Sequence, residues 1–218
     1  MQAVLFDLYD TFVWSRWGEL SDHVADRIGV DRAALHEAYA LTRPARSTGA
    51  YGDAEGDMAA VVSAAGVDAV PSLIRELTSY ERAFLADGGV TVYEDSLDVA
   101  AELRARGMRT ALVSNCSHST IRVVEQLGLA DVLDALVLSV TAGVAKPDAG
   151  IYRAALDALG APPEEAIFVD DQARYCDGAA ALGIGTRLIV RPSSNPIEGI
   201  AADTNGHAVI TDLHELLV

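Results

Sequence analysis

The sequence predicts an α/β protein with a doubly wound parallel sheet and a helical segment inserted after the first strand. Short apolar runs of strand length alternate with longer runs of helical periodicity, which is the pattern of such a sheet. A glycine ends each of four helical runs, as is common at helix C-termini: Gly107, Gly128, Gly160 and Gly183. The 218 residues, half of them hydrophobic, are enough for a sizeable core.

Six short apolar runs are the predicted strands, in chain order Ala3–Phe6, Thr110–Val113, Leu136–Leu138, Ala166–Val169, Arg187–Val190 and Ala208–Ile210. Helices are expected near Ser96–Arg106, Ser119–Leu127, Ile151–Leu159 and Cys176–Leu182, with Thr211–Leu217 last. Because helical runs separate the strands, the strands are expected to lie parallel, as in doubly wound sheets.

One stretch, from about Ser15 to Gly89, breaks this alternation. It is rich in Ala, Leu and Glu and contains no convincing strand, and its interior from Thr42 to Asp57 holds a proline and three glycines. We expect a helical insertion with a flexible middle. The predicted division is a core of residues 1–14 and 90–218 and a helical cap of residues 15–89.

Composition excludes several classes of function. The net charge of −16 argues against nucleic acid and acidic membranes as partners, because both are polyanions. No apolar run approaches the about 18 residues that a membrane span needs. The N-terminus lacks the basic region of a signal peptide, and Cys116 and Cys176 form no disulfide framework or metal spacing, so the cytoplasm is the expected compartment. The sequence does not indicate the oligomeric state.

Polar side chains follow the ends of four predicted strands, where open α/β sheets bind ligands. In chain order they are Asp7, Ser114 with Asn115, Lys146, and Asp170 with Asp171. Lys146 is the only lysine among sixteen basic residues. A lysine in place of arginine suggests a compact charge beside a carboxylate or phosphate.

These residue types fit one chemistry. Adjacent carboxylates are difficult to keep ionised without a cation, and oxygen ligands suit Mg²⁺. A carboxylate beside Mg²⁺ and a lysine can act as a nucleophile that forms an acyl intermediate, while a hydroxyl and an ammonium hold the oxygens that gain charge. Simpler interpretations remain open: Ser114-Asn115 as a helix N-cap, Asp7 as a turn cap, and Asp170-Asp171 as a solvated turn.

At these residues the chain resembles the haloacid dehalogenase-like (HAD) hydrolase superfamily. Four segments are similar to its motifs, in the same order: Phe6-Asp7-Leu8-Tyr9-Asp10-Thr11, Ser114, Lys146-Pro147-Asp148 and Val169-Asp170-Asp171. The resemblance implies a Rossmann-like core with a helical cap inserted after the first motif. It also implies a small-molecule substrate, which is phosphorylated in the phosphatases of the superfamily.

The resemblance implies a role for each matching residue. Asp7 is the expected nucleophile, and Thr11 supports its loop. Ser114 and Lys146 are expected to bind the transferred group. Asp171, with Asp170, is expected to hold Mg²⁺ together with Asp7 and the backbone carbonyl of Tyr9.

Two positions depart from the phosphatases of this superfamily. Tyr9 stands where most of them carry an aspartate that acts as general acid and base. A phenol titrates near pH 10, so Tyr9 is a poor base at neutral pH. Asp10 comes one place later and is expected to point elsewhere. Tyr175 replaces the usual Asp or Asn four residues after Asp171, which weakens the surroundings of the metal site.

Tyrosine at this position is typical of the 2-haloacid dehalogenases of the same superfamily. They also resemble this chain at Asn115, Lys146 and Tyr152, which makes Asn115 and Tyr152 candidate substrate-binding residues. Their aspartate attacks carbon without Mg²⁺, and a cap arginine binds the substrate carboxylate. Arg43 and Arg46 are the candidates here.

The leading hypothesis is a Mg²⁺-dependent hydrolase of a small phosphomonoester, because the acidic pair favours a metal and a metal has no role in the dehalogenase reaction. The alternatives are a metal-free 2-haloacid dehalogenase and a protein that binds its ligand without turnover because Tyr9 replaces the base. A receiver-type phosphoacceptor ranks last, because its acidic pair would come first in the chain. The substrate is not readable, since fold does not fix function.

Overall fold

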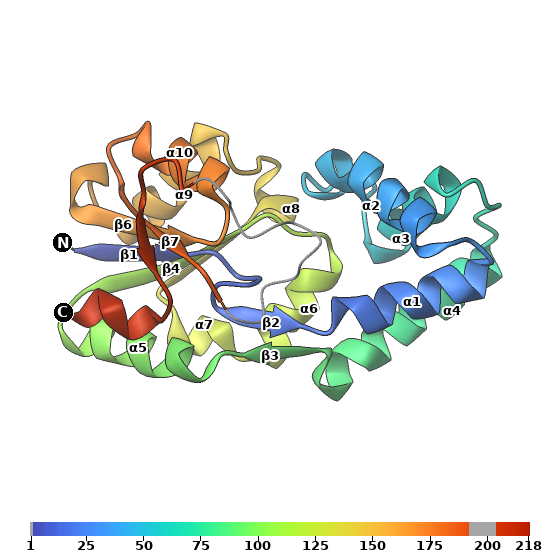
Figure 1. Ribbon diagram of the computed structural model, residues 1–218, viewed down its shortest axis with the longest axis horizontal. Helices are drawn as coiled ribbons and strands as arrows, with labels where there is room; N and C mark the ends of the chain where they lie inside the picture. Colours follow the sequence, from blue (N-terminus) through green and yellow to red (C-terminus); the bar gives the residue numbers. More distant parts are fainter. Residues whose placement is uncertain (1, 192–203) are drawn as a thin grey trace.

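The computed structural model describes residues 2–191 and 204–218. These residues form a six-stranded sheet with helices on both faces, and a separate group of four helices (Figure 1). The strand order is β5-β4-β1-β6-β7-β8, and every neighbouring pair is parallel. The strands are β1 (Ala3–Phe6), β4 (Arg109–Ser114), β5 (Ala135–Leu138), β6 (Ala166–Asp170), β7 (Gly185–Ile189) and β8 (Ala208–Ile210). The predicted doubly wound sheet is confirmed.

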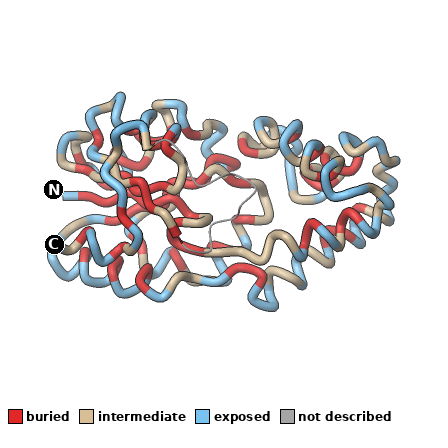
Figure 2. Tube along the Cα trace, in the orientation of Figure 1, coloured by how far each residue is buried: buried red, intermediate tan, exposed pale blue. Residues whose placement is uncertain are grey.

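Both faces of the sheet are buried. Val4 and Phe6 of β1 belong to one apolar cluster, and Ala3 and Leu5 belong to another on the opposite face. This explains why the strands read as continuous apolar runs rather than as alternating ones. Helices α5 (Glu94–Ala105), α6 (Ser119–Gln126), α7 (Leu129–Val132) and η3 (Leu213–Leu217) contribute to the first cluster; α9 (Ala149–Leu159) and α10 (Ala173–Ala180) contribute to the second. Figure 2 shows the strands as a largely buried layer.

Some element boundaries differ from the prediction. Helix α10 begins three residues before the expected Cys176, and β7 begins two residues before Arg187. The expected last helix is a short 3-10 helix, η3, whose first turn is capped by Asp212 and Glu215. Two further short elements are α8 (Ser139–Ala142) and η2 (Pro163–Glu165). Local patterning locates elements better than it locates their ends.

The inserted stretch folds as four helices, α1 (Trp17–Ile28), α2 (Arg32–Arg46), α3 (Ala54–Ala64) and α4 (Pro71–Phe84). We call residues 17–84 the helical unit. Its helices have an apolar cluster of their own. The predicted flexible middle is shorter than expected, because α2 continues through Pro44 and α3 begins at Ala54. The carboxylate of Asp53 caps α3 by accepting from the backbone N–H of Gly56.

A small antiparallel ribbon joins the helical unit to the sheet. It pairs β2 (Val13–Ser15) with β3 (Val90–Val92), and β3 directly follows the π-helix η1 (Leu85–Gly89). The sequence analysis missed both strands, because three residues are too few to show a period. The ribbon lies where the chain leaves and re-enters the sheet domain (Figure 1). None of the helices in the described ranges is long and apolar enough to cross a membrane.

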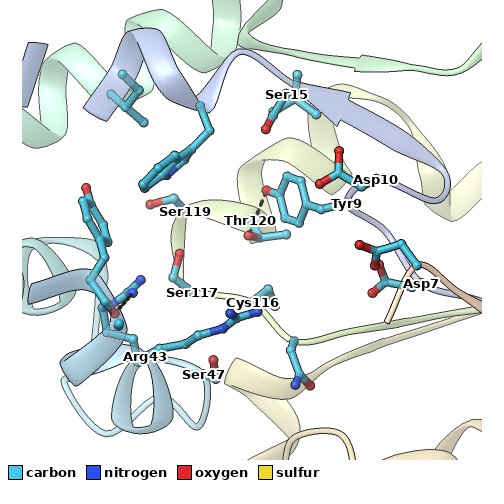
Figure 3. A pocket seen from close by; sticks show the side chains of 18 of the residues that line it. Asp7, Tyr9, Asp10, Ser15, Arg43, Ser47, Cys116, Ser117, Ser119 and Thr120 are labelled. Carbon is cyan, nitrogen blue, oxygen red and sulfur yellow. Dashed lines mark hydrogen bonds between the residues drawn. The ribbon is translucent and has the colours of Figure 1, made fainter. Parts of the chain in front are cut away.

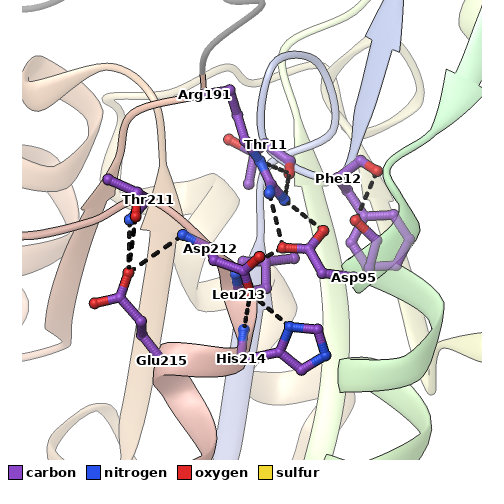
Figure 4. Close-up of polar contacts among 10 residues, drawn as sticks. Thr11, Phe12, Asp95, Arg191, Thr211, Asp212, Leu213, His214 and Glu215 are labelled. Atoms are coloured by element: carbon purple, nitrogen blue, oxygen red, sulfur yellow. Dashed lines mark hydrogen bonds and ion pairs between the residues drawn. The ribbon is translucent and has the colours of Figure 1, made fainter.

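A buried ion pair ties the C-terminal part of the chain to the loop after β1 (Figure 4). The Arg191 guanidinium contacts both carboxylate oxygens of Asp95, at 2.7 and 2.9 Å, and donates to the carbonyl of Thr11 at 2.8 Å. Asp95 also accepts from the backbone N–H of Leu213 at 2.7 Å. Because both ions make further hydrogen bonds, the desolvation penalty of the buried pair is better repaid. It fixes the backbone just beyond Asp7.

Candidate active site

Three strand ends meet at one edge of the sheet. Asp7 directly follows β1, and its backbone N–H donates to the carbonyl of Val169 in β6 at 2.9 Å. Ser114 is the last residue of β4, and Asp170 is the last residue of β6. Because the strands are parallel, residues far apart in the chain come together here.

Lys146 lies between two carboxylates at this edge. Its ammonium nitrogen is 2.5 Å from Oδ1 of Asp7 and 2.7 Å from Oδ2 of Asp170. The lysine side chain is 1% exposed and that of Asp170 is 0% exposed. Burial lowers the pKa of Lys146, but the charges of Asp170 and Asp7 outweigh it and raise that pKa above its ordinary value. The nitrogen also lies over the rings of Phe168 and Tyr175. Lys146 is therefore a fixed cation beside Asp7.

Asn115 holds the backbone of the lysine loop. Its Nδ2 donates to the carbonyl of Lys146 at 2.8 Å, and its Oδ1 accepts from the N–H of the same residue at 2.7 Å. These bonds position Lys146. Asn115 also lines the cavity described below, and its contact with a substrate stays a prediction.

The three aspartates form a cluster of acidic oxygens. Asp7, Asp170 and Asp171 each offer an oxygen within 4.8 Å of the other two. Burial and the charge of Asp7 raise the pKa of Asp171 to about 7, even though Nε2 of Gln172 donates to its carboxylate. The carboxylate is thus buried beside a second carboxylate. The donor set therefore fits a divalent cation with oxygen ligands.

Asp170 differs from Asp171 in its surroundings. Its Oδ2 accepts from Lys146 and its Oδ1 accepts from the backbone N–H of Gln172, both at 2.7 Å. Asp170 is completely buried, whereas Asp171 lines the cavity. The sequence analysis gave both residues the same task. In the structure, Asp170 orients Lys146, and Asp171 is the member of the pair that faces the open space.

Tyr9 is held away from any role as a base. Its hydroxyl lies 3.1 Å from Oγ1 of Thr120, in the first turn of α6. Burial raises the pKa of the Tyr9 phenol above its ordinary value. Asp10 lines the same cavity as Asp7, and the expectation that its side chain points elsewhere than that of an acid–base aspartate stays a prediction. Its backbone is left-handed, with φ of 57°, and this conformation turns its side chain differently from that of an extended residue.

A cavity of about 450 Å³ lies between the sheet edge and the helical unit (Figure 3). Both predicted arginines line it, and Figure 3 shows Arg43 pointing into it from α2. Arg46 donates to Oγ1 of Thr42 at 3.0 Å and to the carbonyl of Tyr39 at 2.9 Å. Burial lowers the pKa of Arg46 from its ordinary value. The cavity lining thus contains acidic groups of the sheet edge and the two guanidinium groups of α2, together with Glu81 of α4.

A family model for haloacid dehalogenase-like hydrolases matches residues 1–183. The chain belongs to this hydrolase family. A phosphoglycolate phosphatase of Rhodospirillum rubrum is 31% identical over 214 residues, which cover 92% of this chain and 85% of the relative. Several other curated relatives, among them phosphatases and haloacid dehalogenases, match over only about half of their own length: 56%, 57% and 55%.

Solved structures of the HAD family share the fold. The L-2-haloacid dehalogenase of Xanthobacter autotrophicus with chloropropionic acid covalently bound has a TM-score of 0.70 at 20% identity, covering 99% of this chain and 96% of that one. An HAD-family enzyme of Bacteroides thetaiotaomicron in complex with magnesium and inorganic phosphate has a TM-score of 0.70 at 17% identity, covering 91% and 98%. At these identities the likeness concerns the fold alone.

Three predicted site residues are fully buried: Tyr152, Thr11 and Ser114. Tyr152 is fully buried, and its hydroxyl donates to the carbonyl of Tyr175 at 2.7 Å, so it supports Tyr175 and does not line the cavity. The hydroxyls of Thr11 and Ser114 are buried and have no hydrogen-bond partner among residues 2–191 and 204–218. Thr11 anchors its loop through its carbonyl, which accepts from Arg191.

The sequence analysis missed several cavity residues that the HAD motifs do not include. They are supplied mainly by the helical unit and by the start of α6: Trp17, His36, Tyr39, Glu81, Ser117, Ser119 and Thr120. No local signal marks these residues, because their common property is a shared cavity that only the docked helices create.

Proposed function

We propose that this HAD hydrolase is a Mg²⁺-dependent phosphatase that cleaves a small phosphomonoester through an aspartyl-phosphate on Asp7. The observation that carries the proposal is the carboxylate of Asp171, which lines the cavity and has an oxygen within 4.8 Å of one of Asp7. A metal-free reaction gives this carboxylate no task. The phosphatase relative from Rhodospirillum rubrum supports the same choice.

The metal would be held by Asp7 and Asp171, with the carbonyl of Tyr9, and it would supply positive charge to the transferred phosphoryl group. A carboxylate oxygen of Asp7 attacks phosphorus, the bond from phosphorus to the ester oxygen breaks, and the alcohol leaves with that bond's electron pair. Lys146 keeps Asp7 oriented and offsets the charge on the phosphoryl oxygens. Water then hydrolyses the acyl phosphate, which releases phosphate and restores the carboxylate.

The unpartnered hydroxyl of Ser114 supports binding of an anion at the end of β4. A buried hydroxyl without a partner is unfavourable, and an oxygen of a bound phosphoryl group would supply one. We assign the other end of the cavity to the rest of the substrate, with Arg43 and Arg46 as the contacts for its polar or anionic part. The helical unit then acts as the cap that selects the substrate.

Tyr9 sets a limit on the reaction. Because its raised pKa keeps the phenol neutral, Tyr9 does not serve as a base, and leaving groups that need protonation react slowly. Esters of acidic alcohols, such as aryl phosphates, should therefore react faster than alkyl phosphates. We place the enzyme in the cytoplasm, where the free thiols of Cys116 and Cys176 would stay reduced.

Hydrolysis of p-nitrophenyl phosphate with Mg²⁺ and then with EDTA tests the proposal, with Asp7→Asn as the blank. Release of phosphate that needs Mg²⁺ and disappears in the variant is expected. Tyr9 also favours a second candidate, metal-free dehalogenation, for which Arg43 would bind a carboxylate. Chloride release from 2-chloropropionate in EDTA, without phosphatase activity, would replace the first proposal by the second. Failure of both reactions would leave ligand binding without turnover.

A further inference from the structure

The helical unit contacts the active-site domain through a buried carboxylate on α3. Oδ2 of Asp57 accepts from the backbone N–H of His118 at 3.0 Å and lies 2.8 Å from Nδ1 of the same residue. Asp57 is 4% exposed, and the two residues are 61 positions apart in the chain. His118 precedes α6, so the carboxylate also lies at the positive end of a helix.

His118 belongs to a segment, residues 117–120, that forms part of the cavity wall. Ser117, Ser119 and Thr120 all line the cavity, and Figure 3 shows their side chains close together at the start of α6. A second acid of the helical unit, Glu81 on α4, lines the same cavity. The contact of Asp57 with His118 thus joins the helical unit to this part of the cavity wall.

The same segment contacts the loop that carries Asp7. Oγ1 of Thr120 is 3.1 Å from the hydroxyl of Tyr9, and Thr120 is buried. A continuous set of contacts therefore runs from Asp57 through residues 117–120 to Tyr9, two residues from Asp7. Displacement of α3 would loosen the cavity wall and the tyrosine together.

The two carboxylate oxygens of Asp57 differ in their contacts. Both contacts with His118 use Oδ2, whereas Oδ1 is buried and has no hydrogen-bond partner among the residues that the structure describes. A buried carboxylate oxygen without a partner is unfavourable, so the position of Asp57 depends on the contacts of its other oxygen with His118. An asparagine would keep the accepting oxygen and remove the charge.

We propose that Asp57 is a positioning residue that fastens the helical unit to residues 117–120 and thereby holds the substrate cavity and Tyr9 in their reactive arrangement. Asp57 touches neither substrate nor nucleophile in this scheme. It acts by raising the population of the form that binds substrate. This proposal rests on the hydrolase activity proposed above, although one of its two tests does not need turnover.

The kinetic test compares Asp57→Ala with Asp57→Asn and with Glu55→Ala, an exposed acid on the same helix. Loss of both hydrogen bonds to His118 should raise KM for p-nitrophenyl phosphate roughly tenfold in Asp57→Ala and change kcat less than about twofold, because the reactive form becomes rarer but not slower. Asp57→Asn and Glu55→Ala should stay close to the parent enzyme. His118→Ala removes one of the two contacts and should give a smaller rise in KM. A loss of kcat of the same size in Asp57→Ala, with an unchanged KM, contradicts the proposal.

The structural test measures the distance between spin labels by pulsed electron paramagnetic resonance. The labels are attached through Ser63→Cys on α3 and Asp157→Cys on α9, both exposed, while the native cysteines are buried. The enzyme and Asp57→Asn should give one narrow distance distribution, and Asp57→Ala a broader one at longer distance. An unchanged distribution in Asp57→Ala overturns the proposal even if no substrate is turned over. An absence of phosphatase activity with the expected distances would count against the proposed function alone.

Discussion

Replacement of Lys146 by methionine should destabilise the fold because it leaves two carboxylates without their cation. The ammonium lies 2.5 Å from Asp7 and 2.7 Å from Asp170 and is almost completely buried. Methionine has a similar length and no branch, so it fills the same space without charge. The change therefore tests the charge more than the packing.

The expected magnitude follows from burial. Removal of one partner of a buried ion pair costs about 3 to 5 kcal/mol, because the remaining charge is left in a medium of low dielectric. Asp170 is 0% exposed, so solvent does not offset this cost. For a chain of this length each kcal/mol corresponds to about 2 to 4 °C, which predicts a melting temperature lower by roughly 6 to 20 °C.

Urea unfolding followed by circular dichroism in EDTA measures the effect in Lys146→Met, Asp170→Asn and the double variant. Lys146→Met should lower the free energy of unfolding by about 1 to 3 kcal/mol less in the Asp170→Asn background than in the parent protein. This difference is the coupling expected for residues in contact. Arg153→Met, an exposed cation lost from α9, is the matched control and should stay within about 0.5 kcal/mol. A loss below about 1 kcal/mol, or an equal loss in both backgrounds, refutes this reasoning.

Two further predictions concern the active site. Mg²⁺ at about 100 times its dissociation constant should raise the free energy of unfolding by about 2.7 kcal/mol, measured by calorimetry. Asp171→Asn should abolish this stabilisation, and the control Asp157→Asn should keep it. Stabilisation that survives in Asp171→Asn would place the metal elsewhere. Tyr9→Asp should raise kcat for alkyl phosphates by about 10²-fold, which is the lower end of what an acid–base group contributes. An unchanged or lower kcat in a steady-state phosphate-release assay would show that Tyr9 does not limit turnover.

The family motifs illustrate how far local sequence can go. Asp7, Lys146 and Asp170 were predicted to meet because each follows a strand of a parallel sheet, and the topology alone brings such ends together. The structure confirms their proximity in the Lys146 ion pairs. The division of labour between Asp170 and Asp171 was not predictable, because it depends on which carboxylate the lysine reaches.

Other residues needed the tertiary structure. Tyr152 was predicted to bind substrate, yet its hydroxyl donates to the backbone carbonyl of Tyr175 inside the fold. The left-handed backbone of Asp10, which lines the cavity, was also not visible in the sequence. Side-chain direction follows the backbone dihedral angles of a loop, and these are not written in hydrophobic periodicity.

The sequence by itself determined the parallel sheet, the position of the helical insertion and the edge where the charged residues gather. These depend on periodicity and on the order of elements, which are local properties of the chain. The tertiary structure decided the shape of the cavity and the contacts of Thr120 with Tyr9 and of Asp57 with His118. Those contacts join residues 111 and 61 positions apart and depend on how the helical unit docks on the sheet domain. Docking is fixed by the packing of whole surfaces, so no short segment of sequence encodes it.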